Sequence, residues 1–188
     1  LVFDLAGRLL RREYATAAPT PPDLFTHDRL GRVVRAECQR YANVTTRAFD
    51  GAGRLSEEAL EIDGRRYPTQ YGHDLAGQQD LVRYASGKEL RRGFTQRGLL
   101  ETVTFDGRLA AQFGYDPGAR ETARTFGNTV TTTTSFTRPD DQVTRMRTPG
   151  LGGAPDLLDF QYDYDPNKNK LFEANGPGGF TERYDAFD

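Results

Sequence analysis

Several features that mark common protein classes are missing from this sequence of 188 residues. It has one cysteine, Cys38, and no tryptophan. A single cysteine excludes intrachain disulfides and cysteine-rich zinc sites. No apolar run of about 18 residues is present, so a membrane span is not expected. The first residues also lack the basic start and apolar stretch of a secretory signal peptide.

An excess of charge of one sign is lacking too. The 25 lysines and arginines nearly balance the 27 aspartates and glutamates, and the net charge is −2. Because the basic residues are dispersed along the chain, the sequence does not predict a nucleic-acid partner. Hydrophobic residues make up 36% of the chain, which is lean for a closed globule, and 20 glycines and 10 prolines punctuate it.

What the sequence does contain is an internal repeat, in which an aspartate is followed three residues later by glycine and then usually by arginine. The near-complete copies are Phe3 to Leu9, His27 to Val33, Phe49 to Leu55 and His73 to Gln78. Degraded copies follow at Arg97-Gly98, Tyr115 to Gly118, Arg138 to Asp140, Tyr164 to Asn167 and Tyr184-Asp185. The aspartates recur with a mean spacing of about 22 residues, which is typical of a repeat architecture.

Each copy has the chemistry of a tight hairpin turn. Aspartate at position i and glycine at i+3 favour a type I turn followed by a left-handed residue, because the carboxylate caps a backbone N–H and glycine accepts positive φ. The predicted hairpin tips are Asp4–Gly7, Asp28–Gly31, Asp50–Gly53 and Asp74–Gly77. In the later copies, Pro117, Pro139 and Pro166 fix φ at position i+1, so turns are also predicted at Asp116 and Asp165.

A second set of turn signals lies midway between these tips. It consists of the pairs Asp63-Gly64, Ser86-Gly87, Asp106-Gly107, Gly127-Asn128 and Asn175-Gly176, with longer loops at Pro19 to Asp23 and Pro149 to Pro155. The segments between turns are rich in strand-forming residues, as in Thr102 to Phe105, Arg108 to Phe113, Glu121 to Phe126 and Thr129 to Thr134. Helical spacing is convincing only over Leu55 to Ile62, and eight residues between two turns cannot hold a helix alone.

The predicted fold is therefore all-β, with about sixteen antiparallel strands in consecutive hairpins. An open sheet of so many strands coils, splits or closes, so we expect part of a coiled β-sheet shell. Residues 1–188 are interpreted as a single array segment with no separate domain. Because both ends lie inside a repeat copy, we expect it to be a section of a longer array whose neighbouring repeats are its partners.

The repeat resembles the YD repeat of the Rhs family, which is shared with the C components of bacterial Tc toxin complexes and with teneurins. The resemblance rests on the four near-complete copies, on Thr125 to Thr133 and on Tyr162 to Lys170, and it covers essentially the whole chain. It implies a hollow shell of β-hairpins, which in bacterial members encloses a toxin. His27 and His73 replace the aromatic residue and Gln78 replaces the arginine, and the family's self-cleaving protease segment and toxin domain have no counterpart here.

No catalytic residue, metal site or cofactor is predicted. His27 and His73 are two repeats apart, too far to share an ion, and are interpreted as half-buried rings. The alternation Asp163, Asp165, Asn167, Asn169 resembles the opening of a calcium loop, but Lys168 and Ala174 replace the required glycine and glutamate. Cys38 has no predicted base and is interpreted as a strand or loop residue.

The arginines Arg8, Arg32 and Arg54 carry the most specific structural hypothesis. Each follows the turn glycine at a fixed offset. We expect its guanidinium to stack on an aromatic ring, or to bind an acidic side chain, of the adjacent repeat and so to tie neighbouring hairpins together. The alternative is a solvated charge at the rim that contributes little.

The leading functional interpretation is structural and not enzymatic: a length of shell wall that encloses a toxin or effector cargo, in a protein that is secreted or delivered at the cell surface. A second interpretation is an extracellular repeat module that binds carbohydrate or protein through exposed aromatic residues. A third is a β-repeat glycoside hydrolase with an unrecognised pair of carboxylates.

Overall fold

The computed structural model describes residues 1–15, 20–137 and 142–183, and within these ranges the chain is all β. The corners predicted at Arg138 to Asp140 and at Tyr184-Asp185 lie outside the described residues, as does Pro19. The strands are β1 (Val2–Phe3), β2 (Leu9–Arg12), β3 (Asp23–His27), β4 (Val33–Cys38), β5 (Asn43–Phe49), β6 (Leu55–Ile62), β7 (Arg65–His73), β8 (Gln79–Arg83), β9 (Glu89–Phe94), β10 (Leu100–Phe105), β11 (Arg108–Tyr115), β12 (Glu121–Phe126), β13 (Thr131–Phe136), β14 (Val143–Thr148), β15 (Leu158–Tyr164), β16 (Lys170–Asn175) and β17 (Phe180–Arg183). Two short 3-10 helices are η1 (Gln39–Tyr41) and η2 (Leu151–Gly153).

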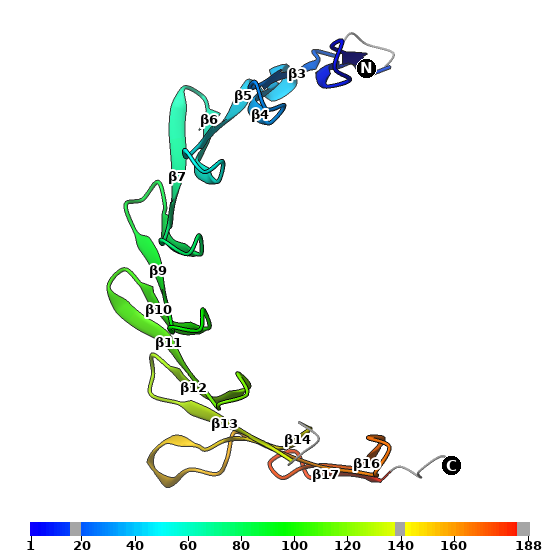
Figure 1. Ribbon diagram of the computed structural model, residues 1–188, viewed down its shortest axis with the longest axis vertical. Helices are drawn as coiled ribbons and strands as arrows, with labels where there is room; N and C mark the ends of the chain where they lie inside the picture. The colour runs from blue at the N-terminus through cyan, green and yellow to red at the C-terminus, as the bar shows by residue number, and fades with distance from the viewer. Residues whose placement is uncertain (16–19, 138–141, 184–188) are drawn as a thin grey trace. The chain divides into compact units, whose positions relative to one another are not determined.

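Every strand pairs with the strand that follows it in the sequence, in one open sheet (Figure 1). Neighbouring strands run antiparallel, as in the pairs β1–β2, β6–β7, β7–β8, β10–β11 and β11–β12. This confirms the predicted fold class of consecutive antiparallel hairpins. It also confirms that Leu55 to Ile62 is not helical, because this segment forms β6 and pairs with both β5 and β7.

The chain divides into two compact units, Leu1–Leu90 and Arg91–Asp188. The first contains β1 to β8, and the second contains β10 to β17. The boundary lies within β9. Both units are built from the same succession of hairpins, so the division does not reflect a change of architecture.

Neither unit has a large apolar core. Among the described residues, the buried apolar side chains are Ala59, Val82 and Val130, with exposed fractions of 2%, 7% and 8%. Most other side chains on the strands are half-buried, as expected for a single layer of sheet. Strand pairing, contacts between side chains on neighbouring strands and turn hydrogen bonds therefore hold the fold together.

Two of the midpoint turns have the predicted two-residue form. Asp63 and Gly64 have φ values of 50° and 71°, and Asp106 and Gly107 have values of 52° and 77°. Positive φ at both central residues defines the type I′ turn, whose twist matches that of the flanking strands.

The other three predicted pairs form wider turns. At Ser86-Gly87 the loop runs from Tyr84 to Lys88, whose carbonyl accepts the Tyr84 N–H at 2.9 Å. At Gly127-Asn128 the left-handed residue is Thr129, with φ of 69°, so the next strand starts at Thr131 and not at Thr129. After Asn175 the loop continues through Gly179, where φ is 61°.

One turn gives no glycine or proline signal. Strand β4 connects to β5 through η1, and Ala42 closes the connection in the left-handed region with φ of 48°. The longer loop predicted at Pro149 to Pro155 is present and contains η2.

Candidate functional site

The repeated aspartates form a series of corners with one backbone geometry. The Asp4 N–H donates to the Arg8 carbonyl at 2.9 Å, and the Gly7 N–H donates back to the Asp4 carbonyl at 3.0 Å. The same two bonds form at the corners that begin at Asp28, Asp50, Asp74, Asp116 and Asp165. The fourth residue of each corner has positive φ: Gly7, Gly31, Gly53 and Gly77 lie between 77° and 87°, Ala119 has 66° and Lys168 has 71°.

The aspartate side chain holds each corner from inside. In the second corner, Asp28 Oδ1 accepts the N–H groups of Leu30 and Arg32, both at 2.9 Å. Asp28 Oδ2 accepts the Arg32 Nε–H at 2.6 Å. The first and third corners repeat this arrangement, with Nε to Oδ2 distances of 2.6 Å for Arg8 and Asp4 and 2.8 Å for Arg54 and Asp50. Arg120 and Asp116 repeat it at 2.6 Å.

These contacts lower the pKa of five corner carboxylates, those of Asp4, Asp28, Asp50, Asp116 and Asp165. The Arg54 backbone N–H, followed by its guanidinium, lowers the pKa of Asp50. At Asp116, the Arg120 guanidinium is the largest cause of the lowered pKa. At Asp28, desolvation is the largest single influence and raises the pKa, but the combined hydrogen bonds outweigh it and the pKa is still lowered. These five corners therefore favour the ionised form of their aspartate.

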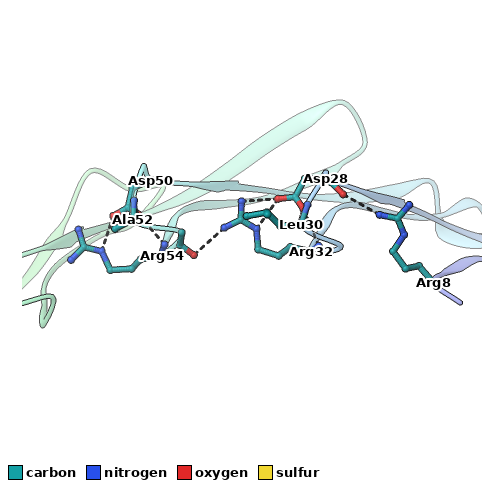
Figure 2. Close-up of polar contacts among 8 residues, drawn as sticks. Arg8, Asp28, Leu30, Arg32, Asp50, Ala52 and Arg54 are labelled. Atoms are coloured by element: carbon teal, nitrogen blue, oxygen red, sulfur yellow. Dashed lines mark hydrogen bonds and ion pairs between the residues drawn. The ribbon is translucent and has the colours of Figure 1, made fainter. Parts of the chain in front are cut away.

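Arg8 and Arg32 also reach forward to the next corner (Figure 2). Arg8 Nη1 donates to the Asp28 carbonyl at 3.2 Å, and Arg32 Nη1 donates to the Gly53 carbonyl at 3.1 Å. The guanidinium carbon of Arg32 lies 3.9 Å from the centre of the Phe49 ring, which precedes the next corner. A side chain that bonds its own turn and the following one is hereafter called a corner clasp.

The acidic partner of these arginines differs from the prediction. We expected an acidic side chain of the adjacent repeat, whereas each arginine binds the aspartate of its own turn. The reason is local, because the strand that leaves the turn places the i+4 side chain beside the capping carboxylate. Arg8 contacts the adjacent repeat through its backbone carbonyl, and Arg32 does so through a backbone carbonyl and the Phe49 ring.

Two further arginines also contact the following repeat, and of these Arg120 also binds the aspartate of its own turn. Arg120 stacks over Phe136, with 4.8 Å between the guanidinium carbon and the ring centre. It lies four residues after Asp116, so the spacing seen at Asp4 and Arg8 could have identified it. Arg97 has no such signal, because it lies inside its own turn. It donates to the carbonyls of Asp116 at 2.9 Å and Pro117 at 2.7 Å.

Among the corners that lie in the described residues, those beginning at Asp74, Thr95 and Asp165 have a residue other than arginine four positions later. Gln78 donates its backbone N–H to Asp74 Oδ1 at 2.8 Å. In the corner that begins at Thr95, the hydroxyl oxygen accepts the Leu99 N–H at 3.1 Å. Asn169 donates its backbone and side-chain N–H groups to Asp165 at 2.7 and 2.9 Å. The turn survives each replacement, since the cap needs only an oxygen acceptor.

The remaining candidate residues are separate from these contacts. His27 and His73 end β3 and β7 and are both half-buried. Cys38 ends β4, directly opposite Asp23. Within residues 1–15, 20–137 and 142–183, no three His, Cys, Asp or Glu side chains lie close enough together to hold a metal ion. The described part of the chain has no helix of the length and apolarity needed to cross a membrane.

No family model and no curated protein matches this chain. Among solved structures, it is similar to the TcdB2–TccC3–Cdc42 crystal structure, with a TM-score of 0.52 over 91% of this chain and 15% identity. TcdB2–TccC3 without its hypervariable C-terminal region gives a TM-score of 0.53 over 92% of this chain, also at 15% identity. The Tc holotoxin pore of Photorhabdus luminescens gives 0.52 over 92% at the same identity.

These matches show the fold. The chain spans 12% of the length of each matched chain, so it corresponds to a small part of them. The resemblance to Tc toxin components that the repeats predicted is therefore confirmed at the level of structure.

Proposed function

We propose that this chain is a length of wall in a β-sheet shell that encloses a toxin or effector cargo. The observation that carries the proposal is the unbroken ladder from β1 to β17, in which every strand pairs with the next. The shared fold with part of the TcdB2–TccC3 chains supports it.

The geometry suits a barrier better than a binding cleft. Strands that are hydrogen-bonded on both sides resist proteases, because cleavage requires a segment to open and enter the protease as an extended chain. The corner clasps add a second row of contacts along one edge, from Arg8 to the corner at Asp28 and from Arg32 to the corner at Asp50. Such a wall acts through continuity and needs no catalytic residue, metal or cofactor.

The partners follow from this role. Residues 1–188 act as one segment of a longer array, with neighbouring repeats of the same longer chain on both sides and a cargo polypeptide on one face. We infer that the parent protein is secreted or delivered at the cell surface, and the fold shared with part of a Tc holotoxin pore supports this inference.

Protease protection tests the proposal. The complete reading frame that contains this segment is expressed, purified and digested with a non-specific protease, with and without prior denaturation. We expect a region outside the repeats to survive digestion in the native particle and to be digested after denaturation. The control is the same region expressed alone, which is digested readily. The proposal fails if that region is cleaved equally fast in the native particle and alone.

A further inference from the structure

The hairpin of β6 and β7 is longer than the hairpin that follows it. β7 has nine residues, and its ladder with β6 runs from Arg65 to Gln70. Its ladder with β8 begins only at Gln70, which pairs with Arg83, and ends at His73. The segment Arg65 to Thr69 is therefore paired on the β6 side and lies outside the β7–β8 ladder. This segment is hereafter called the open edge of β7.

The direction of each backbone group on this edge follows from the turn. In a two-residue type I′ hairpin, the flanking residues Ile62 and Arg65 bond to each other. Because successive residues of a strand point their N–H and C=O groups to opposite sides, Arg66 and Pro68 direct theirs away from β6. Asp74 lies six residues after Pro68, so its N–H should also point away from β6. This N–H donates to the Gln78 carbonyl across the β7–β8 corner, as expected.

Pro68 thus occupies a position where its missing N–H costs no bond to β6. It leaves the open edge with one outward donor, the Arg66 N–H, and two outward carbonyls. A strand that adds to an antiparallel edge needs alternating N–H donors and C=O acceptors along that edge. Proline is found on edge strands because its missing N–H interrupts this alternation.

The side chains beside this edge make strand addition a hazard. Tyr67 lies directly opposite Leu60, and the two are 46% and 37% exposed. Ile62, on the same face as Leu60, is 38% exposed. A foreign strand on the open edge would cover this apolar surface, which is a favourable change.

A second long hairpin protects its edge differently. The ladder of β11 with β12 begins at Ala111, so Arg108 to Ala110 extend beyond it. Here the Gly127 N–H donates to the Ala110 carbonyl at 2.9 Å. Gly127 lies so close that a Cβ there would be 2.2 Å from the Leu109 carbonyl oxygen. The following turn thus covers the edge of β11, and no proline is present on it.

We propose that Pro68 blocks the open edge of β7 against strand addition by a second copy of this chain. The proposal is independent of the shell function, since it concerns one hairpin and its own edge. A second copy is the relevant partner because the same edge, with the same Tyr67 and Leu60 beside it, is present in every molecule.

The test restores the missing donor. Pro68→Thr adds an N–H and a strand-forming side chain, and Pro68→Ala adds the N–H alone. We expect both variants to keep the β circular dichroism signal and to associate in sedimentation velocity as concentration rises, with the weight-average mass moving toward twice that of the monomer. Hydrogen exchange at residues 66 and 68 should slow in the associated sample.

A matched variant separates the donor from the side chain. In Arg66→Pro/Pro68→Thr, the missing N–H moves to the other outward position of the same edge, so the monomer should return. The proposal is overturned if both single variants fold and sediment as wild type at every concentration. It is also overturned if the double variant associates as strongly as Pro68→Thr.

Discussion

Replacing Arg32 with lysine should loosen the junction between two neighbouring hairpins while keeping the charge. Arg32 binds Asp28 of its own turn, donates to the Gly53 carbonyl at 3.1 Å and stacks 3.9 Å from the centre of the Phe49 ring. A lysine ammonium is a compact point charge without the planar fork, so it cannot make these three contacts together.

The expected loss can be worked out contact by contact. Stacking of a cation on an aromatic ring at a partly exposed site contributes about 0.5–1 kcal/mol. A net hydrogen bond to the Gly53 carbonyl contributes about 1 kcal/mol. The attraction to Asp28 is largely retained by lysine. We therefore expect Arg32→Lys to lower the local free energy of opening by about 1.5 kcal/mol, which corresponds to roughly a tenfold larger opening constant.

Hydrogen exchange measured by mass spectrometry is the suitable assay. In a repeat array each hairpin depends mainly on its neighbours, so the amides of β4 and β5 should exchange about tenfold faster while those of β15 and β16 stay unchanged. Arg35→Lys is the matched control. Arg35 binds Glu37, two residues away in the same strand, and its side chain is 46% exposed. It should change stability by about 0.3 kcal/mol or less. If Arg32→Lys exchanges no faster than Arg35→Lys, the clasp does not hold the junction.

Two further predictions concern the corners. Ala119 has φ of 66°, a conformation that favours glycine, so Ala119→Gly should raise the free energy of unfolding by about 0.5–1 kcal/mol. The reciprocal change Gly7→Ala should lower the free energy of unfolding by about 1 kcal/mol, because φ at Gly7 is 77°. No atom lies within 4 Å of the added methyl, so this loss measures the backbone conformation and not a steric clash. Urea unfolding measures both, and a loss of stability in Ala119→Gly would contradict the strain argument. The pKa of Asp50 is lowered in the folded state, first by the Arg54 backbone N–H and second by the Arg54 guanidinium. The ionised Asp50 therefore stabilises the fold fully above the unfolded pKa of about 3.9, and this stabilisation is lost as pH falls through the lower folded pKa. Urea midpoints should therefore stay level from pH 7 to about pH 5 and fall below about pH 4, and Asp50→Asn should show a weaker fall; parallel profiles for the two proteins would refute the assignment.

The sequence by itself determined the corners and the strand order. Asp28, Gly31 and Arg32 interact within five residues of chain, so local turn chemistry predicts their geometry without knowledge of the rest of the fold. The same holds for the type I′ turns at Asp63-Gly64 and Asp106-Gly107. Since consecutive strands joined by such turns pair with each other, the antiparallel ladder follows from the spacing alone.

Only the tertiary structure decided which groups meet across hairpins. The contact of Arg32 with Gly53 and Phe49 spans about twenty residues, and Arg97 takes a similar role from inside its turn. Gly127 is held by its contact with Leu109 and Ala110 of another strand, which moves the left-handed residue to Thr129. Pro68 lies on an open edge only because the ladder of β7 with β8 begins at Gln70. These features depend on strand lengths and register, which set the distances between residues far apart in the sequence. Strand length and register cannot be read from any single repeat copy, so the sequence did not predict these contacts.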